Sequence, residues 1–168
     1  RAKAEEILRT MVEEANPALN IHLFNEFFKF YAESCNVQAL QGVLRLSLST
    51  RPKIALDSYS YSYIMEGFIR AKQPNNALTT FNLMHKHNVQ PNQFIYSSVL
   101  RALALKGDGQ SAEMIINDMI RNEAVIVPVH ISTAMIACIR GRNMLFVESL
   151  VKLAKQKFQR LDVVISTV

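Results

Sequence analysis

Histidine, cysteine and the acidic residues are the side chains of this sequence that could bind a metal ion or carry out catalysis. His85 and His87 are two residues apart, so on a helix they point to different faces and make poor metal geometry. No H-x-x-x-H, C-x-x-C, paired acidic constellation or glycine-rich phosphate loop occurs, and Ser, His and Asp are scattered without a nucleophile motif. We therefore expect no catalytic residue, no metal site and no cofactor, and we predict that this chain is not an enzyme.

The composition is that of a folded, mildly basic chain. It has 168 residues, enough for one ordinary domain, with 49% hydrophobic and 20% charged residues. The net charge of +5 is compatible with an anionic partner. Cys35 and Cys138 are too few for a disulfide framework, and we expect two reduced thiols in the core. No apolar run approaches the length of a membrane span, so we predict no membrane insertion.

Hydrophobic residues recur in stripes of helical spacing at a period of 35 residues. Tyr61 and Tyr96 each begin one stripe, and polar breaks follow at 72–76 and 106–109. A second stripe follows each break, and two of its positions match at the same period: Ala77 with Ala112, and Met84 with Met119. Each stripe–break–stripe unit predicts a helical hairpin.

The pattern extends in both directions with less regular linkers. We expect one array with a half repeat at 1–19 and repeats at about 20–57, 58–92, 93–128 and 129–162. The segment 47–57 is irregular, and the linker 122–128 is about two residues longer than its counterpart. Neither end carries a polar capping helix, so we expect repeats to continue on both sides.

A single hairpin is too small to bury its own apolar stripes, whereas stacked neighbours form one continuous core. The sequence therefore predicts an all-α fold, an α-solenoid in which antiparallel helical hairpins stack into a right-handed superhelix. Turn-prone residues between the stripes end each helix, and Pro91 and Pro128 suit the start of the next unit. Gly107-Asp108-Gly109 is interpreted as a hairpin turn.

A period of 34 or 35 residues is typical of tetratricopeptide and pentatricopeptide repeats. The first family usually carries an early Trp, and this chain has none. The unit 58–92 closely resembles the pentatricopeptide repeat, with an early aromatic residue, a mid-helix Gly-Phe, an Ala-Leu that opens the second helix and a Val-Gln-Pro-Asn close. These are Tyr61, Gly67-Phe68, Ala77-Leu78 and Val89–Asn92.

The resemblance implies that the first helices line a groove for single-stranded RNA, with one base facing each repeat. The side chain just after the early aromatic residue and the last side chain of the unit would read the base edge: Asn25, Asp57, Ser62, Asn92, Ser97 and Thr133. In the family's pairing scheme, Asn with Asp reads uracil, and Ser with Asn reads adenine. Helix capping is the alternative explanation of a Ser or Asn near a helix start.

The same resemblance assigns base stacking to the residue two places before the aromatic one. Tyr59 and Phe94 hold this place in the two regular units, and His22 or Leu23 and His130 hold it elsewhere; core packing is the alternative. Five cations near the ends of first helices would contact phosphates: Arg70, Lys72, Lys106, Arg140 and Arg142. A solvated helix face is the alternative for this basic set.

Two functions follow as hypotheses. The first is a protein that recognises single-stranded RNA of a mitochondrion or plastid and acts in its processing, stability, translation or editing. The alternative is a scaffold subunit of a large ribonucleoprotein or protein complex, such as an organellar ribosome, that contacts partner proteins through its solenoid surface. The chain starts in a helical pattern without Met, so we expect any targeting segment upstream of residue 1.

Overall fold

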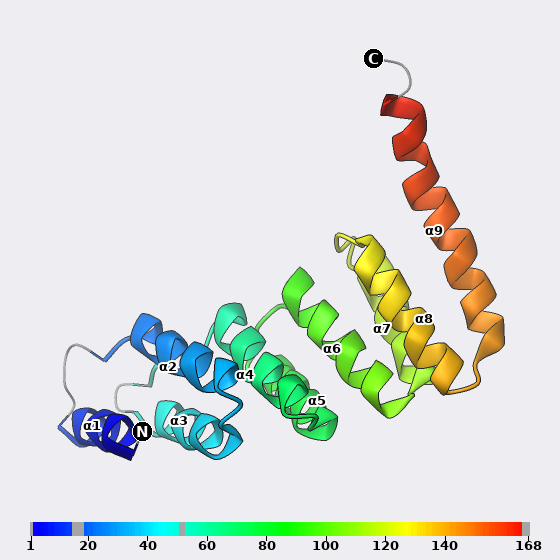
Figure 1. Ribbon diagram of the computed structural model, residues 1–168. Helices are drawn as coiled ribbons and strands as arrows, with labels where there is room; N and C mark the ends of the chain where they lie inside the picture. The colour runs from blue at the N-terminus through cyan, green and yellow to red at the C-terminus, as the bar shows by residue number, and fades with distance from the viewer. Residues whose placement is uncertain (1, 15–18, 51–52, 166–168) are drawn as a thin grey trace. The chain divides into compact units, whose positions relative to one another are not determined.

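The computed structural model describes residues 2–14, 19–50 and 53–165, so parts of the expected half repeat and of the irregular segment lie outside it. These ranges contain helices and no strand, which confirms the all-α prediction. The helices are α1 (Ala2–Glu13), α2 (Ile21–Glu33), α3 (Val37–Ser49), α4 (Ser58–Arg70), α5 (Pro74–Lys86), α6 (Gln93–Lys106), α7 (Gly109–Arg121), α8 (Pro128–Arg140) and α9 (Met144–Ile165) (Figure 1). None of these helices combines the length and the hydropathy needed to cross a bilayer.

Short polar side chains start most of these helices. In each case a side-chain oxygen of the cap residue accepts a hydrogen bond from the backbone N–H three residues later, which satisfies one of the orphan donors of the first turn. The cap residues are Asn20, Asn36, Asp57, Asn92 and Asp108. Proline at the first position starts α5 and α8 instead, since its fixed φ suits the first turn and no N–H is needed there.

One turn geometry closes the first helix of every hairpin. The turn residue is left-handed at Cys35, Lys72, Gly107 and Arg142, with φ between 51° and 70°. The next backbone N–H then bonds a carbonyl five residues back, as from Gln73 to Phe68 at 2.8 Å and from Asn143 to Cys138 at 2.8 Å. Cys35 is exposed in this turn, so its predicted burial is wrong, whereas Cys138 is buried.

The helices repeat in a strict register from α4 onward. The first helices α4, α6 and α8 begin at 58, 93 and 128, and the second helices α5, α7 and α9 begin at 74, 109 and 144. The linker at 122–127 thus equals the linker at 87–92, and the prediction of a longer linker there is wrong. Pro128 starts α8 at its first residue and makes Val127 the cap. The extra residues lie between α3 and α4, whose starts at 37 and 58 are two residues further apart than those of α5 and α6.

Two compact units divide the chain at Pro91 and Asn92. In the first, α2 packs against α3 and α4, α4 against α5, and α1 against α3 (Figure 1). Large side chains from these helices are fully buried between them: Phe24, Phe28, Tyr31, Leu40, Tyr61 and Met65. Gly67 lies in this core, where a Cβ would meet Leu40 and the backbone of Ala32.

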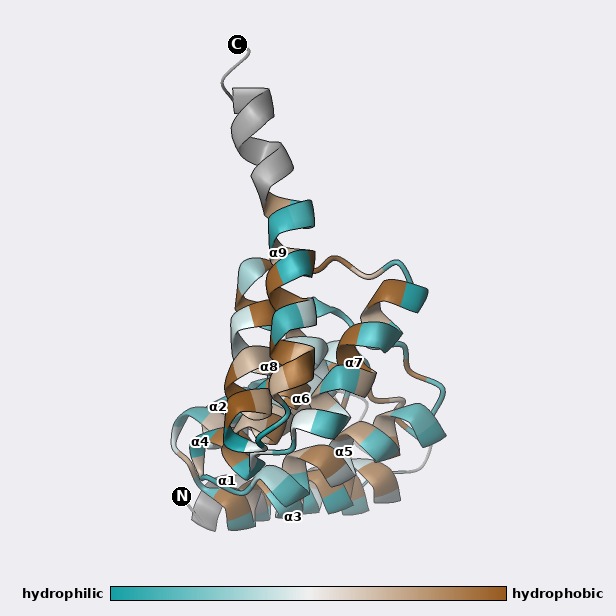
Figure 2. Cartoon of the chain, turned by 90° about the vertical axis from the view of Figure 1, so that its right-hand side faces the viewer, coloured by the Kyte–Doolittle hydropathy of each residue, from teal (hydrophilic) through white to brown (hydrophobic). Residues whose placement is uncertain are grey.

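In the second unit, α8 packs against α6, α7 and α9. Buried Tyr96, Leu100, Ile116 and Met119 form its core, and Figure 2 shows hydrophobic and hydrophilic residues interleaved along α7. Small buried residues, Ala102, Ala112, Ala134 and Ala137, let these helices pack closely. The unit is therefore held by contacts between consecutive hairpins and within them.

Gly109 should not tolerate a side chain. A Cβ at this position would lie 2.7 Å from the Cα of Cys138 and 3.3 Å from the carbonyl oxygen of Ala137, both in the backbone of α8. Because this backbone cannot yield without moving the helix, we expect Gly109→Ala to lower the free energy of unfolding by about 1–3 kcal/mol. Chemical denaturation of both variants measures this, with the exposed neighbour change Gln110→Ala as the control. Equal stability of the two variants would contradict the close contact.

Candidate nucleic-acid interface

The second and fifth residues of each first helix lie on one side of it, since they are three positions apart. In α4 these are Tyr59 and Ser62, and in α6 they are Phe94 and Ser97. Tyr59 is 57% exposed and Phe94 is 59% exposed, so core packing does not explain either ring. Each of these helices therefore presents an accessible aromatic face beside a short hydroxyl.

In the first unit, the structure brings Asn25 and Asp57 together. The Asn25 Nδ2 donates to Asp57 Oδ1 at 3.4 Å. Ser60, the third residue of α4, donates its hydroxyl to Asn25 Oδ1 at 2.7 Å and lies 2.9 Å from Asp57 Oδ1. The backbone N–H groups of Ser60 and Asp57 complete a capping box with these side chains. Asp57 is thus both a helix cap and a partner of the fifth residue of the preceding first helix.

Ser62 and Asn92 belong to different units. Ser62 is half-buried and donates its hydroxyl to the Ser58 carbonyl at 2.8 Å. Asn92 caps α6 by accepting from the Ile95 N–H at 2.9 Å. Their predicted pairing on one base stays a prediction.

In the second unit, Ser97 contacts His130. The Ser97 hydroxyl donates to the Gln93 carbonyl at 3.0 Å and lies 2.8 Å from His130 Nε2. His130 Nδ1 accepts from the Val127 N–H at 3.3 Å, which assigns the ring proton to Nε2. Burial lowers the pKa of His130, and the Gln93 carbonyl opposes this more weakly. His130 is fully buried, so its predicted stacking on a base is wrong.

The register of α8 also moves the predicted base-reading position. Counted from the helix start, the fifth residue of α8 is Ser132, and Thr133 follows it by one. Ile131, buried in the core, occupies the place of Tyr61 and Tyr96. Ser132 is exposed and Thr133 is half-buried. The placement of Thr133 equivalent to Ser62 and Ser97 is wrong because the linker before α8 contains no insertion.

Of the five residues predicted to contact phosphates, three are exposed cations and two have hydrogen-bond partners within the protein. Lys72, Lys106 and Arg142 are exposed at the hairpin turns. Arg70 Nε bonds Glu66 Oε1 at 2.9 Å, and Arg140 Nη1 donates to the Ala104 carbonyl at 2.7 Å. Arg140 therefore also joins α8 to the last turn of α6, where the Ala104 carbonyl accepts from the Gly107 N–H as well.

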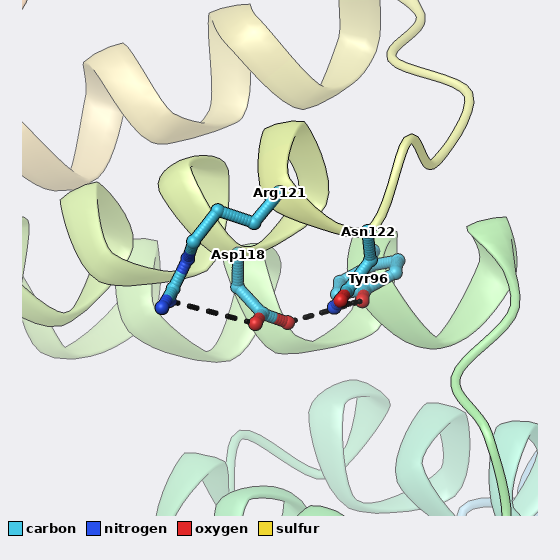
Figure 3. A network of polar contacts seen from close by, with 4 residues as sticks. All are labelled: Tyr96, Asp118, Arg121 and Asn122. Carbon is cyan, nitrogen blue, oxygen red and sulfur yellow. Dashed lines mark hydrogen bonds and ion pairs between the residues drawn. The ribbon is translucent and has the colours of Figure 1, made fainter.

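The fourth residue of the first helix anchors each of two hairpins. Tyr61 Oη lies 2.5 Å from His87 Nδ1, and burial raises the pKa of Tyr61 to about 12. Tyr96 Oη donates to Asp118 at 3.1 Å and lies within reach of Asn122, while Arg121 pairs with Asp118 (Figure 3). These bonds join the start of one helix to the end of the next and hold the neighbouring fifth residue in place. Among the described residues, no group of three His, Cys, Asp or Glu side chains could hold a metal ion.

The sequence matches known repeat profiles in its regular part. A profile described as the PPR repeat family matches residues 56–105, and one described as the PPR repeat matches 94–123. A chloroplastic pentatricopeptide repeat-containing protein of Arabidopsis thaliana is 26% identical over 125 residues, which is 74% of this chain and 16% of that protein. Residues 56–123 of the chain therefore carry pentatricopeptide repeats.

Two solved pentatricopeptide repeat structures have the same fold. The maize protein PPR10 superposes over 92% of this chain and 22% of its own, with a TM-score of 0.69 and 14% identity. The PPR domain of the Arabidopsis thaliana protein-only RNase P 1, solved in complex with tRNA, superposes over 97% of this chain and 88% of its own, with a TM-score of 0.71 and 12% identity. These likenesses confirm the predicted solenoid of helical hairpins.

Besides Ser132, sequence reasoning missed the roles of two buried polar residues of the interface, Ser60 and His130. Both occupy the third position of a first helix, and both are fully buried. A strict count of 35 residues from Ser97 would have reached Ser132 and put His130 at the third position. The missing aromatic residue at Ile131 obscured this register.

The burial of neutral His130 should make the second unit sensitive to acid. Its pKa lies below the ordinary value of 6.5, so below that pH the unfolded chain binds a proton that the folded chain does not. Stability should be full above about pH 6.5 and should fall as the pH drops toward the lowered pKa. Urea denaturation from about pH 8 to about pH 5 should show a smaller loss for His130→Gln than for the wild type. The other three histidines are present in both proteins, so equal losses would contradict the assignment.

Proposed function

We propose that this pentatricopeptide repeat chain binds single-stranded RNA through the faces of its first helices. The observation that carries the proposal is the pairing of an exposed aromatic residue with a half-buried serine on one helix face: Tyr59 with Ser62, and Phe94 with Ser97. A flat ring can stack on any base, and a short hydroxyl beside it can donate to or accept from the base edge. Both contacts require an unpaired, accessible base.

The charges of the hairpin turns support the same proposal. Lys72, Lys106 and Arg142 are exposed cations at the ends of first helices, where they can contact phosphates. The net charge of +5 favours a polyanion in general. The proposed chemistry therefore combines stacking, base-edge hydrogen bonds and sequence-independent phosphate contacts.

We further propose that the base readers are Asn25 with Asp57, Ser62 with Asn92, and Ser97, with Ser132 replacing Thr133 in the last hairpin. The protein would act on transcripts of a mitochondrion or plastid, in their processing, stability, translation or editing, by occupying RNA rather than by catalysis. A chloroplastic relative and a structural neighbour solved with tRNA support this context.

Removing the two exposed rings should weaken binding to every sequence. We expect Tyr59→Ala with Phe94→Ala to raise the Kd for single-stranded oligoribonucleotides by at least about tenfold, since stacking contributes roughly 1–3 kcal/mol per base. Fluorescence anisotropy measures this, with a duplex of the same sequence as a competitor. Met114→Ala, which removes an exposed apolar side chain from the second helix α7, is the control.

Exchanging one reading pair should change which base is preferred. Ser62→Thr with Asn92→Asp should move the preference at one position from adenine toward guanine, because a carboxylate accepts where the amide donated. A shift of about 1 kcal/mol is expected, the lower end for a good base-edge contact. Titration against four oligoribonucleotides that differ at one base measures it. An unchanged order of the four affinities would refute the pairing.

Failure of both titrations favours the other function. If neither the wild type nor the variants bind any single strand, the helix faces serve protein contacts in a larger assembly. The chain would then be a scaffold subunit, recovered with partner proteins after mild crosslinking.

A further inference from the structure

The third residue of two first helices contacts the fifth residue of the first helix before it. Ser60 of α4 bonds Asn25 of α2 at 2.7 Å, and His130 of α8 bonds Ser97 of α6 at 2.8 Å. Both third residues are fully buried, whereas both fifth residues are half-buried. The same contact between equivalent positions thus occurs once in each unit.

We propose that these third residues are positioning residues that set the hydrogen-bonding pattern which the fifth residue offers to a base. The inference rests on the proposed RNA-binding function and adds Ser60 and His130 to it. Neither residue would touch RNA. Each would act by fixing the donor and acceptor groups of its partner before the base arrives, which reduces the ordering cost of recognition.

In the first unit, the partner of Ser60 is the side-chain amide of Asn25. Without fixed partners, the oxygen and nitrogen of this amide could exchange places by rotation. Asp57, when ionised, only accepts hydrogen bonds, so it favours the orientation in which the Nδ2 of Asn25 faces it, but at 3.4 Å this contact is too long to fix the amide by itself. The Ser60 hydroxyl then donates to the remaining Oδ1. Asn25 keeps one free N–H and one free lone pair in a fixed order. A freely flipping amide could present them in either order and would match the edges of different bases equally well.

In the second unit, His130 fixes the direction in which the Ser97 hydroxyl donates its proton. Nδ1 accepts from the Val127 N–H, so the ring proton is on Nε2. Nε2 lies 2.8 Å from the Ser97 hydroxyl and 3.2 Å from the Gln93 carbonyl, and the shorter contact directs the proton mainly at Ser97. Ser97 sends its own proton to the Gln93 carbonyl. One lone pair of the Ser97 oxygen remains, so this side chain offers a base an acceptor and no donor.

Capping alone makes a different prediction from positioning. Ser60 belongs to the capping box of α4, so its loss must lower stability in any case. A cap that only stabilises the helix changes the affinity for all bases by the same factor. A positioning residue changes the ratio between bases.

The first test compares Ser60→Ala with Ser111→Ala in the full chain. Ser111 is also the third residue of its helix and bonds the Asp108 cap at 2.8 Å, but α7 is a second helix. Affinities are measured for four oligoribonucleotides that differ at the base facing Asn25. We expect the ratio between the best and the worst base to fall about fivefold in Ser60→Ala, equivalent to ~1 kcal/mol, and to stay unchanged in Ser111→Ala. Ser60→Thr, which keeps the hydroxyl, should restore the ratio.

The second test uses the other unit, so it holds even where Ser60→Ala does not fold. At the base facing Ser97, His130→Gln keeps an N–H donor for the serine oxygen and should retain the wild-type ratio. His130→Leu removes the donor, and its base ratio should fall by a similar factor. Thermal unfolding of each variant reports the stability change separately.

The outcomes separate this inference from the proposed function. A wild type that binds no single strand overturns both. A wild type that binds and discriminates, with ratios unchanged in folded Ser60→Ala and His130→Leu, overturns the positioning role alone. Equal losses of the ratio in Ser60→Ala and Ser111→Ala would assign the effect to helix stability and also overturn it.

Discussion

The capping of each first helix is the interaction on which the interface of this protein depends. Because Asp57 and Asn92 fix the first residue of α4 and α6, they also fix which residues are second, third, fourth and fifth. If the sequence were shifted by one residue along the same packed helix, every side chain would be rotated by about 100° and residues that are now exposed would be buried. The exposed ring, the buried tyrosine and the half-buried serine of each helix follow from this single starting point.

Buried polar groups in the interface are satisfied by one another. Ser60 and His130 are fully buried, yet each has partners on its own helix start and on the preceding first helix. Such groups would cost about 1–3 kcal/mol each if they were left unpaired. Separating two neighbouring first helices would break the same hydrogen bonds that orient Asn25 and Ser97. The packing of the hairpins and the arrangement of these polar side chains are therefore energetically coupled.

The repeat pattern was sufficient to predict the fold because burial of apolar stripes dominates it. Spacing identified the hairpins of residues 58–121, and the structure places helices there in strict register. Prediction from the sequence was less successful where a repeat lacks the residue type that usually marks a position. Ile131 replaces an aromatic residue, so Thr133 was assigned the place of Ser132, and His130 was expected at the surface. Hydrogen-bond partners such as Ser60 and Asn25 lie on different helices. The hydrophobic periodicity of the sequence predicts each helix but not the side-chain contacts between helices.

The left-handed turns after the first helices have a consequence for how the sequence is constrained. Glycine fits this backbone without strain, and Gly107 uses it, but the same turn holds Cys35, Lys72 and Arg142. Each of these side chains costs about 1–2 kcal/mol relative to an ordinary conformation, so folding alone would favour glycine at all four tips. Two of the three exceptions are long cations directed to solvent. The fold therefore does not require a cation at Lys72 or Arg142, and glycine would stabilise the turn at either position.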